Sequence, residues 1–444
     1  MACEWHSAPL GELISYIGKG VAPKYINDGL DATMVLGQKC VRNQSLQYEQ
    51  ARFHNSAEKA VNPDKEVRKG DILINATGVG SAGRVAQVMA DPSRQCITDG
   101  HVITLRAKDI NPFYLGYFVK SKQKTIELMA EGSTGQTEMN RQRLQSEIIV
   151  TFPESKDLQK RIAEYGLAID KKITVNNQLN DYLEQLCQSL FDRFDNDENN
   201  LFVKVSDIAD VNPRRTLKKG EEALCVEMAD LSTTGAFPTD WRTKAYNGGV
   251  KFVNGDTILA RITPCLENGK AGYINFLEQD EVAFGSTEYI VLTSKGELPS
   301  EFFYFLARNE DFISYATAHM NGSSGRQRVS GADVGNYEVR MPSEKQVSEF
   351  KEIAGKAMRV ISASSIESRK LAQSRDALLP KLMSGEIDVS KVDLTQPTNN
   401  HLAGRMHWST VIRVRAIHAV HSRQSQIPAY ESVPRVLHSH ATPP

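Results

Sequence analysis

Residues 158–190, LQKRIAEYGLAIDKKITVNNQLNDYLEQLCQSL, decide how the rest of the chain is organised. Apolar or aromatic residues recur along this segment at alternating steps of three and four, the spacing of a helix that packs lengthwise against another helix. Lys172 and Asn176 interrupt the stripe, and a buried Asn at such a position can fix the register and number of the paired helices. The predicted seam is Ile162, Tyr165, Ile169, Lys172, Asn176, Leu179, Leu183, Leu186 and Leu190.

A second segment, after residue 343, has the same spacing but smaller side chains, which let two helices approach closely. Its positions are Val347, Phe350, Ala354, Ala357, Ile361, Ser364, Ser368, Leu371, Arg375, Leu378 and Leu382. The alternative is that each helix only covers its own domain. The seams are longer than that role needs, so pairing of the two helices with each other, as an antiparallel coiled coil, is the favoured interpretation.

The chain also repeats itself outside these helices. Four motifs of its first half recur in the same order, 185 to 195 residues later. Short β-type runs, for example Val102–Leu105 and Thr257–Ala260, and helical stretches, for example Ser300–Thr317, surround them in each half. The pairs are 10–13 with 205–208, 69–73 with 254–259, 132–136 with 322–326, and 152–154 with 341–343. Four motifs in register, each set followed by a long helix, indicate a duplicated unit.

These patterns predict an α+β protein with an internal pseudo-two-fold repeat. Two mixed α/β globules are joined by two long helices. The predicted parts are a first globule at 1–153, a central helical spacer at 154–197, a second globule at 198–342, a C-terminal helical spacer at 343–389, and a tail at 390–444 whose composition predicts disorder.

The composition is that of a globular protein, with 40% hydrophobic and 24% charged residues and a formal net charge of −1. No stretch approaches the ~20 apolar residues of a membrane helix. The six cysteines are scattered without metal-ligand spacing, so a reducing cytoplasm is the expected location. The charge argues mildly against nucleic-acid binding, but a local cluster of Lys and Arg can be hidden in the sum.

Two motifs resemble catalytic or cofactor-binding motifs, but each lacks a feature that the chemistry requires. Gly78–Gly83 matches the GxGxxG pattern of nucleotide loops, and Asn111–Tyr114 is similar to the catalytic motif of adenine methyltransferases. A nucleotide loop must open a helix, but Arg84–Met89 has the pattern of a β-strand, and the second proline of the catalytic motif is missing. We therefore interpret them as a structural turn and a helix start, and predict no catalytic, cofactor-binding or metal-binding residue.

The sequence resembles the specificity subunits of type I restriction–modification systems over roughly residues 1–390. The residues that carry the resemblance are Trp5 with Pro9–Leu13, the Gly70–Leu73 run, Gly132–Gln136 ahead of Phe152–Pro153, and the closing Leu378–Glu386. It implies that each globule is a target-recognition domain for double-stranded DNA, that the target is bipartite with a gap set by the helices, and that the partners are two methyltransferase subunits and, in the full complex, two restriction subunits. S-adenosylmethionine, ATP and Mg would then belong to the partners.

Basic residues in polar or glycine-rich loops are the candidates for DNA contact, because there the backbone can approach phosphates and a side chain can reach a base edge. The alternative for each is a solvated turn that caps the next helix. The candidates are Lys19, Arg42, Arg84, Arg141 and Arg143 in the first globule, and Arg214, Arg215, Lys218, Lys219, Arg261, Arg326 and Arg328 in the second. We expect the repeat to place Arg141 and Arg143 like Arg326 and Arg328.

Three other functions stay open at this point: a subunit serving a methyltransferase without a restriction motor, a self-contained adenine methyltransferase, and a coiled-coil scaffold that does not read DNA.

Overall fold

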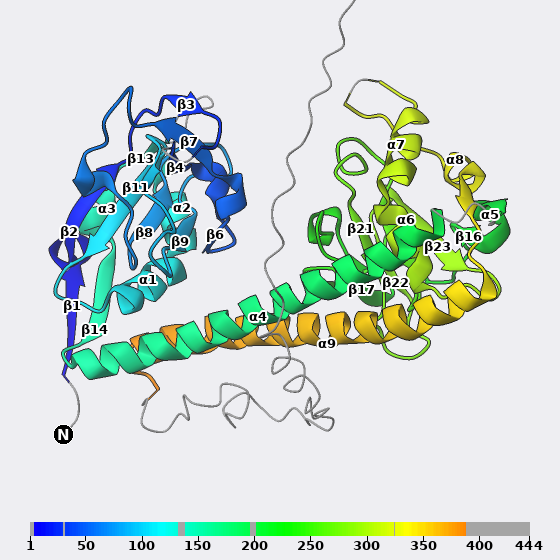
Figure 1. Cartoon of the computed structure of the whole chain (residues 1–444). Coiled ribbons are helices and arrows are strands. Elements are labelled where there is room, and N and C mark those ends of the chain that lie inside the picture. The colour runs from blue at the N-terminus through cyan, green and yellow to red at the C-terminus, as the bar shows by residue number, and fades with distance from the viewer. Residues whose placement is uncertain (1–3, 30–31, 132–137, 196–200, 324, 388–444) are drawn as a thin grey trace, which may run out of the picture. The chain divides into compact units, whose positions relative to one another are not determined.

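The computed structural model describes residues 4–29, 32–131, 138–195, 201–323 and 325–387. The chain is an α+β protein, as predicted, in which two globules built around β-sheets are connected by two long helices (Figure 1). The predicted tail at 390–444 and the whole Gly132–Gln136 motif lie outside the described residues. Among the described residues, none of the helices combines the length and apolarity that a membrane span requires.

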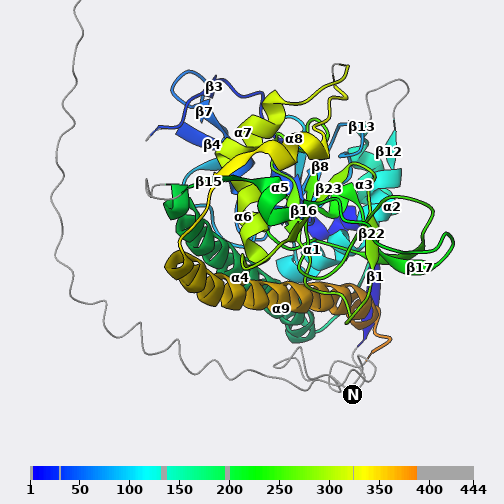
Figure 2. The same ribbon diagram turned by 90° about the vertical axis from the view of Figure 1, so that its right-hand side faces the viewer.

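The two long helices are α4 (Lys156–Asp195) and α9 (Glu344–Met383), each of 40 residues. They lie side by side in both ribbon views (Figures 1 and 2). Asp170 pairs with Arg375 at 2.5 Å, and Asn180 donates to Ser365 at 3.1 Å. Partner numbers on α9 fall as those on α4 rise, so the helices run antiparallel.

A capping box fixes where α9 begins. The Ser343 hydroxyl accepts from the Gln346 amide nitrogen, and the Gln346 side chain accepts from the Ser343 nitrogen at 2.8 Å. Two backbone donors that the helix cannot satisfy internally are thereby bonded, which stabilises the first turn.

The predicted seam of α4 is wrong at three positions, one in its first half and two in its second. In the first half, the Lys172 side chain is 47% exposed, although it pairs with Glu367 of α9. Leu179 and Leu186 are 37% and 49% exposed, whereas Asn180 is half-buried and Cys187 is buried. After Asn176 the packed positions are separated by four residues and then by three, whereas the prediction separated them by three and then by four. Two packed positions therefore lie one residue later than predicted. The predicted positions on α9 are all buried or half-buried.

The first globule contains two four-stranded sheets that both contribute to one apolar cluster, and one of the sheets also contributes to a second cluster. One has the order β2-β11-β8-β9 and the other β10-β4-β7-β3. The strands are β2 (Ile14–Lys19), β3 (Tyr25–Ile26), β4 (Ala32–Leu36), β7 (Arg52–Asn55), β8 (Ile72–Asn75), β9 (Val85–Gln87), β10 (Cys96–Thr98) and β11 (Val102–Ala107). A hairpin of β5 (Val41–Arg42) and β6 (Ser45–Leu46) projects beside them.

Three helices and two small sheets complete this globule. They are α1 (Pro112–Ser121), α2 (Gln123–Leu128), α3 (Arg141–Glu147), the pair β1 (Trp5–Pro9) with β14 (Ile149–Pro153), and the pair β12 (Ala130–Glu131) with β13 (Glu138–Met139). The β1–β14 pair joins the start of the globule to the segment that leads into α4.

The second globule repeats the order of the first sheet and most of the second. Its sheets are β16-β23-β20-β21 and β18-β17-β22-β19. The strands are β15 (Phe202–Lys204), β16 (Ala209–Val211), β17 (Glu222–Val226), β18 (Arg242–Ala245), β19 (Val250–Phe252), β20 (Thr257–Ala260), β21 (Ala271–Tyr273), β22 (Ala283–Gly285), β23 (Tyr289–Ser294) and β24 (Glu338–Arg340). The helices are α5 (Val205–Ile208), α6 (Glu301–Arg308), α7 (Glu310–Ala318) and α8 (Gly331–Asn336).

Each globule packs on both long helices. Tyr165 of α4 and Leu382 of α9 belong to the core of the first globule, and Phe191 of α4 and Phe350 of α9 belong to the core of the second. Tyr114 also donates its hydroxyl to the Met383 carbonyl at 3.2 Å, which ties the end of α9 to the first globule. Each globule is therefore anchored by two chain segments that are far apart in sequence.

Candidate nucleic-acid interface

A group of polar side chains in the first globule is assembled from segments that are distant in sequence. We call it the first polar cluster, and its members are Lys19, Gln38, Arg52, Thr77, Asp99, His101 and Glu138. The cluster lies where β2, β4, β7, β8 and β13 begin or end and where the turn between β10 and β11 passes. Such positions are typical of binding residues, because the sheets hold loop side chains in fixed places.

Asp99 is the buried centre of this cluster. Its side chain accepts from the His101 backbone nitrogen at 2.9 Å and lies 3.9 Å from the Arg52 guanidinium. Only 3% of the residue is exposed, and burial raises the pKa of its carboxyl above the usual value. Its backbone nitrogen donates to the Leu36 carbonyl at 3.1 Å, which fixes the turn against β4.

Thr77 connects the rest of the cluster. Its hydroxyl lies 2.9 Å from Nδ1 of His101, and its carbonyl accepts from the Gln38 amide at 2.6 Å. Thr77 also forms a β-bridge with Glu138, which pairs with Lys19. Five short segments are thus linked through hydrogen bonds and one ion pair.

The second globule has a smaller group in the corresponding place, the second polar cluster of Arg261, Glu288, Arg326 and Arg328. The Arg328 guanidinium donates to both oxygens of Glu288, at distances from 2.7 to 3.0 Å. These bonds lower the pKa of the Glu288 carboxyl. Arg261 donates its backbone nitrogen to the Glu288 carbonyl at 2.9 Å.

The same pair of backbone hydrogen bonds frames both clusters. In the first globule the Ala76 nitrogen donates to the His101 carbonyl, and the Ala76 carbonyl accepts from Met139. In the second, Arg261 makes the same two bonds with Glu288 and Val329.

In this correspondence Arg328, next to Val329, takes the place of Glu138, next to Met139. Arg141 and Arg143 belong instead to the first turn of α3, whose counterpart is α8. The expectation that the repeat places Arg141 and Arg143 like Arg326 and Arg328 is therefore wrong. The short motifs alone did not fix the register of the loop.

The basic candidates of the first globule have different surroundings. Lys19 pairs with Glu138, Arg143 donates to Glu147 at 2.6 Å, and Arg84 donates to the Gly80 carbonyl at 2.8 Å. Arg141 is exposed at the start of α3, and Arg42 is exposed at the β5–β6 hairpin turn, where the next two residues have positive φ. The structure brings Lys19 alone among these five into the first polar cluster.

In the second globule Arg214, Lys218 and Lys219 are exposed in the loop between β16 and β17. Arg326 is exposed in the loop that precedes α8. Arg215 is different, because its guanidinium donates to the buried carboxylate of Asp256. We therefore assign Arg215 a structural role.

Buried Asp256 has a counterpart in the first globule, Asp71. Arg106 of β11 donates to both oxygens of Asp71, at 2.9 and 2.8 Å. Arg215 donates to both oxygens of Asp256 at 2.6 Å, and Thr293 adds a bond at 2.6 Å. The two carboxylates are 1% and 0% exposed.

The two arginines come from different strands. Arg106 lies on β11, whereas Arg215 follows β16, and the position that corresponds to Arg106 on β23 holds Thr293. Sequence reasoning missed both ion pairs because nothing in the local pattern connects an arginine to a carboxylate 35 or 41 residues away.

The segments that resemble catalytic motifs have structural roles. The Gly78–Gly83 turn leads into strand β9 and not into a helix, so it presents no helix N-terminus to a phosphate. The Asn111 side chain caps α1 by accepting from the nitrogens of Phe113 and Tyr114, both at 3.0 Å. Tyr114 is fully buried. This agrees with the interpretation of a structural turn and a helix start.

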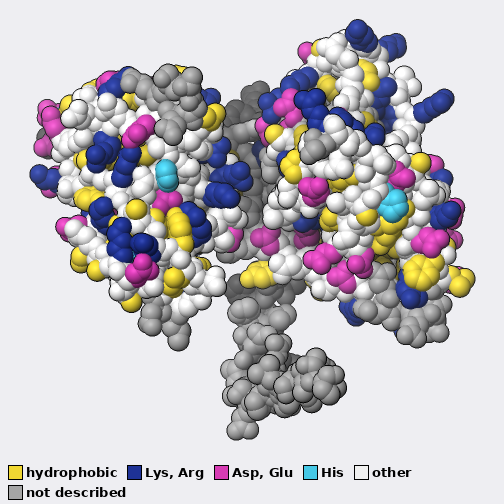
Figure 3. Space-filling view, turned by 90° about the horizontal axis from the view of Figure 1, so that it is seen from above, with side chains coloured by type: hydrophobic (Ala, Val, Ile, Leu, Met, Phe, Trp, Pro, Cys, Tyr) yellow, Lys and Arg dark blue, Asp and Glu magenta, His cyan; other side chains and the backbone are white. Residues whose placement is uncertain are grey.

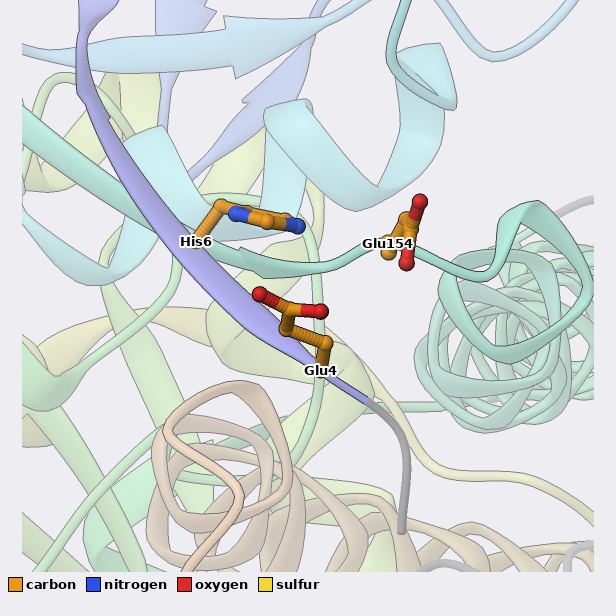
Figure 4. A group of neighbouring side chains, drawn as sticks. All are labelled: Glu4, His6 and Glu154. Carbon is orange, nitrogen blue, oxygen red and sulfur yellow. The ribbon is translucent and has the colours of Figure 1, made fainter. Parts of the chain in front are cut away.

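The sequence predicted no metal ligands, but among the described residues one group could hold an ion: Glu4, His6 and Glu154 (Figure 4). Their ligand atoms lie within 4.8 Å of one another, because Glu4 directly precedes β1, His6 lies on β1 and Glu154 follows the paired strand β14. All three side chains are exposed, so water competes for each ligand. We assign no metal to the group.

Charged side chains of both signs are distributed over the surface of each globule. Figure 3 shows several groups of Lys and Arg on the visible face of each, with Asp and Glu between them. This pattern explains how a chain with a net charge of −1 can still carry local positive patches.

Comparison with known proteins finds similarity to DNA specificity subunits. Residues 4–185 match the family described as type I restriction modification DNA specificity domain. The specificity subunit of the type I restriction enzyme EcoEI from Escherichia coli is 29% identical over 147 residues, which cover 32% of this chain and 25% of that protein. The EcoAI specificity subunit, also from Escherichia coli, is 28% identical over 128 residues, or 28% of this chain and 22% of that protein.

The chain thus spans about a quarter of the length of these two curated relatives. The HindI specificity subunit from Haemophilus influenzae is 21% identical over 73% of this chain and 88% of its own length. Among solved structures, the S subunit of a type I restriction–modification system from M. genitalium superposes with a TM-score of 0.52 at 17% identity, covering 86% of this chain and 96% of that one. That likeness supports the fold.

Proposed function

We propose, from the premise that residues 4–185 match the type I restriction modification DNA specificity domain, that this chain is the DNA-binding specificity subunit of a type I restriction–modification complex. It reads a bipartite, gapped DNA target and directs adenine methylation or cleavage by partner subunits. The observation that carries the proposal is this match together with two globules of corresponding strand order, each anchored on the same pair of antiparallel helices.

The helix pair suits a spacer between two reading heads. Tyr165 in the core of the first globule and Phe191 in the core of the second are 26 residues apart on α4, or about 39 Å along the helix at 1.5 Å per residue. One turn of DNA is roughly 34–36 Å long. In this proposal the helices form a coiled coil, the halves derive from a duplication, and the recognised half-sites differ because the clusters differ.

Catalysis belongs to the partners in this proposal. Two methyltransferase subunits and, in the full complex, two restriction subunits supply the chemistry, and S-adenosylmethionine, ATP and Mg bind there. The absence of a helix after the Gly78–Gly83 turn and the capping role of Asn111 support this division. The same proposal covers a complex without restriction subunits.

Methylome sequencing of cells with and without this chain, in the presence of its catalytic partners, tests the proposal. We expect one asymmetric, gapped adenine-methylation motif to disappear when the chain is removed. Purified chain that binds S-adenosylmethionine and methylates DNA alone would contradict it. A scaffold role predicts instead that the chain confers no sequence-dependent DNA binding even with the methyltransferase present.

A further inference from the structure

Arg52 in the first polar cluster is an exposed arginine whose position is held from two sides. Its guanidinium carbon lies 3.6 Å from the centre of the Tyr25 ring, and it donates to the Tyr25 hydroxyl. On another side, Asp99 lies 3.9 Å from the same guanidinium. The Arg52 side chain is nevertheless 60% exposed, so solvent or a ligand can reach it.

The two holding groups are themselves fixed. Tyr25 lies on β3, which pairs with β7 in register with His54 and Phe53, so Tyr25 and Arg52 belong to neighbouring strands. Asp99 is buried, and its carboxylate is bonded to the His101 backbone nitrogen. A long side chain normally loses rotamer entropy when it binds, and an arginine already held by a ring and a carboxylate loses less.

An arginine that is fixed but exposed is suited to read a base. The guanidinium fork can donate two parallel hydrogen bonds to O6 and N7 of guanine in the major groove, the commonest specific contact between a protein and DNA. A lysine has no such fork and acts as a point charge. A phosphate contact needs only positive charge, and an ordered guanidinium beside a carboxylate is less suited to it, since the carboxylate repels phosphate.

We infer that Arg52 reads a guanine in one half-site, with Tyr25 and Asp99 as positioning residues. The inference rests on the proposed function and adds the base and the residue that recognises it. Sequence reasoning missed Arg52 because its strand has only four residues and the buried carboxylate lies 47 positions further along the chain.

The chain offers a matched control in Arg94. Its guanidinium carbon lies 5.2 Å from the Phe53 ring centre and it pairs with Asp28 at 2.6 Å. Arg94 therefore also combines an aromatic ring with a carboxylate, in the same globule. Its side chain is 27% exposed, against 60% for Arg52, and it donates to the Gly29 carbonyl at 2.5 Å, so its donors are occupied within the protein.

The experiment compares methylation motifs of complexes that contain the wild-type chain, R52A, R52K and R94A, with the partner subunits present. We expect R52A and R52K to lose preference for guanine at one position of one half-site, by roughly tenfold or more, while the other half-site stays unchanged. R94A keeps the wild-type motif. R52K separates base reading from charge, because it retains the positive charge and loses the fork.

Two results would overturn the inference. One is a wild-type motif in R52A and R52K, and the other is an equal loss of affinity for all sequences in R52A with full recovery in R52K, which marks a phosphate contact. Thermal melting of each variant identifies a folding defect, and Y25F, which removes only the hydroxyl, gives a milder test with a partial loss of guanine preference. Failure of the proposed function looks different, because the wild-type chain then confers no motif.

Discussion

Asn176 of α4 donates its side-chain amide to the Ser364 carbonyl of α9 at 3.3 Å, in the middle of the long helix pair. The same amide reaches Glu367 at 2.8 Å and the Ser368 hydroxyl at 3.1 Å. Only 3% of Asn176 is exposed. A buried polar group bonded to three partners on the opposite helix specifies one register between the helices, since any shift leaves the amide unsatisfied.

Replacing Asn176 is expected to weaken the chain measurably. N176A lowers the free energy of unfolding by about 1–3 kcal/mol, because the hydrogen bonds from its buried amide to Ser364, Glu367 and Ser368 of α9 are lost. Urea denaturation followed by circular dichroism measures the change. N177A, on the exposed side of the same turn, is the control and stays within about 0.5 kcal/mol of the wild type. Equal effects of both variants would contradict the assigned role.

Lengthening both helices should lengthen the gap in the recognised DNA. Four residues inserted after Gln178, together with four after Ser365 on the facing part of α9, add about 6 Å to the pair. The expected methylation motif keeps both half-sites and gains one or two base pairs between them. A change in the half-sites themselves would refute the spacer role of the helices.

The buried ion pair of the first globule should matter more than an exposed one. R106A leaves the Asp71 carboxylate buried without its partner and is expected to destabilise the chain by about 3–5 kcal/mol. The comparison variant K356A removes the exposed pair with Glu352 on α9 and costs less than about 1 kcal/mol. Chemical denaturation of both variants gives the two values, and similar costs would show that Asp71 is relieved by other groups.

A pH dependence is expected from Glu184 of α4, whose carboxylate is bonded to the Tyr304 hydroxyl and the Ala236 nitrogen. Burial raises the pKa of Glu184 above the usual value, although these bonds oppose the shift. A raised folded-state pKa means that the folded chain binds more protons, so this group's contribution is full at low pH and is lost as pH rises through the folded pKa.

E184Q stays neutral at every pH. Its amide oxygen can accept from the Ala236 nitrogen, and its NH2 group can donate to the Tyr304 oxygen in place of the second bond. Melting temperatures of E184Q and the wild type, compared between pH 5 and pH 8, should therefore diverge in favour of E184Q as the pH rises. A difference that stays constant over this range would show that the Glu184 carboxyl does not titrate differently in the folded and unfolded chain.

Exposed and paired arginines of the second globule should differ in their effect on DNA binding. R326A removes an exposed cation and is expected to reduce the slope of log K against log salt by about 1, with equal effects on all sequences. R328A breaks the bonds to Glu288, so its main effect is on thermal stability. Fluorescence anisotropy at several salt concentrations, with the complete complex, separates the two.

Much of the architecture could be predicted from the sequence because it depends on periodicity. The 3–4 spacing located both long helices, and the β-type runs at Thr257–Ala260 and Val102–Leu105 coincide with β20 and part of β11. The predicted helical stretch at 300–317 is broken into α6 and α7, since Asn309 has an extended backbone and caps α7 with its side chain. Leu179 and Leu186 were misplaced because an apolar residue one position away from the seam satisfies the same periodic pattern.

The interface was much harder to predict. Asp99, Thr77 and Arg52 are brought together only by the pairing of strands that are distant in sequence, and their burial follows from that pairing. No short stretch of sequence shows that these three residues lie close together. Nor does charge identify such residues, since Arg215 and Arg326 look alike in the sequence, yet one bonds buried Asp256 and the other faces solvent.

The different origins of Arg106 and Arg215 set a rule for building hybrid proteins from this chain. When segments are exchanged between proteins, a buried carboxylate and the arginine that neutralises it must be transferred together. In the first globule that arginine lies on β11, whereas in the second it follows β16. Replacing β23 with the sequence of β11 would place a second guanidinium where Thr293 now meets Asp256, and the reverse exchange would leave Asp71 buried without any cation. Whole globules are thus the smallest exchangeable parts, and new target specificities are best sought by swapping them complete.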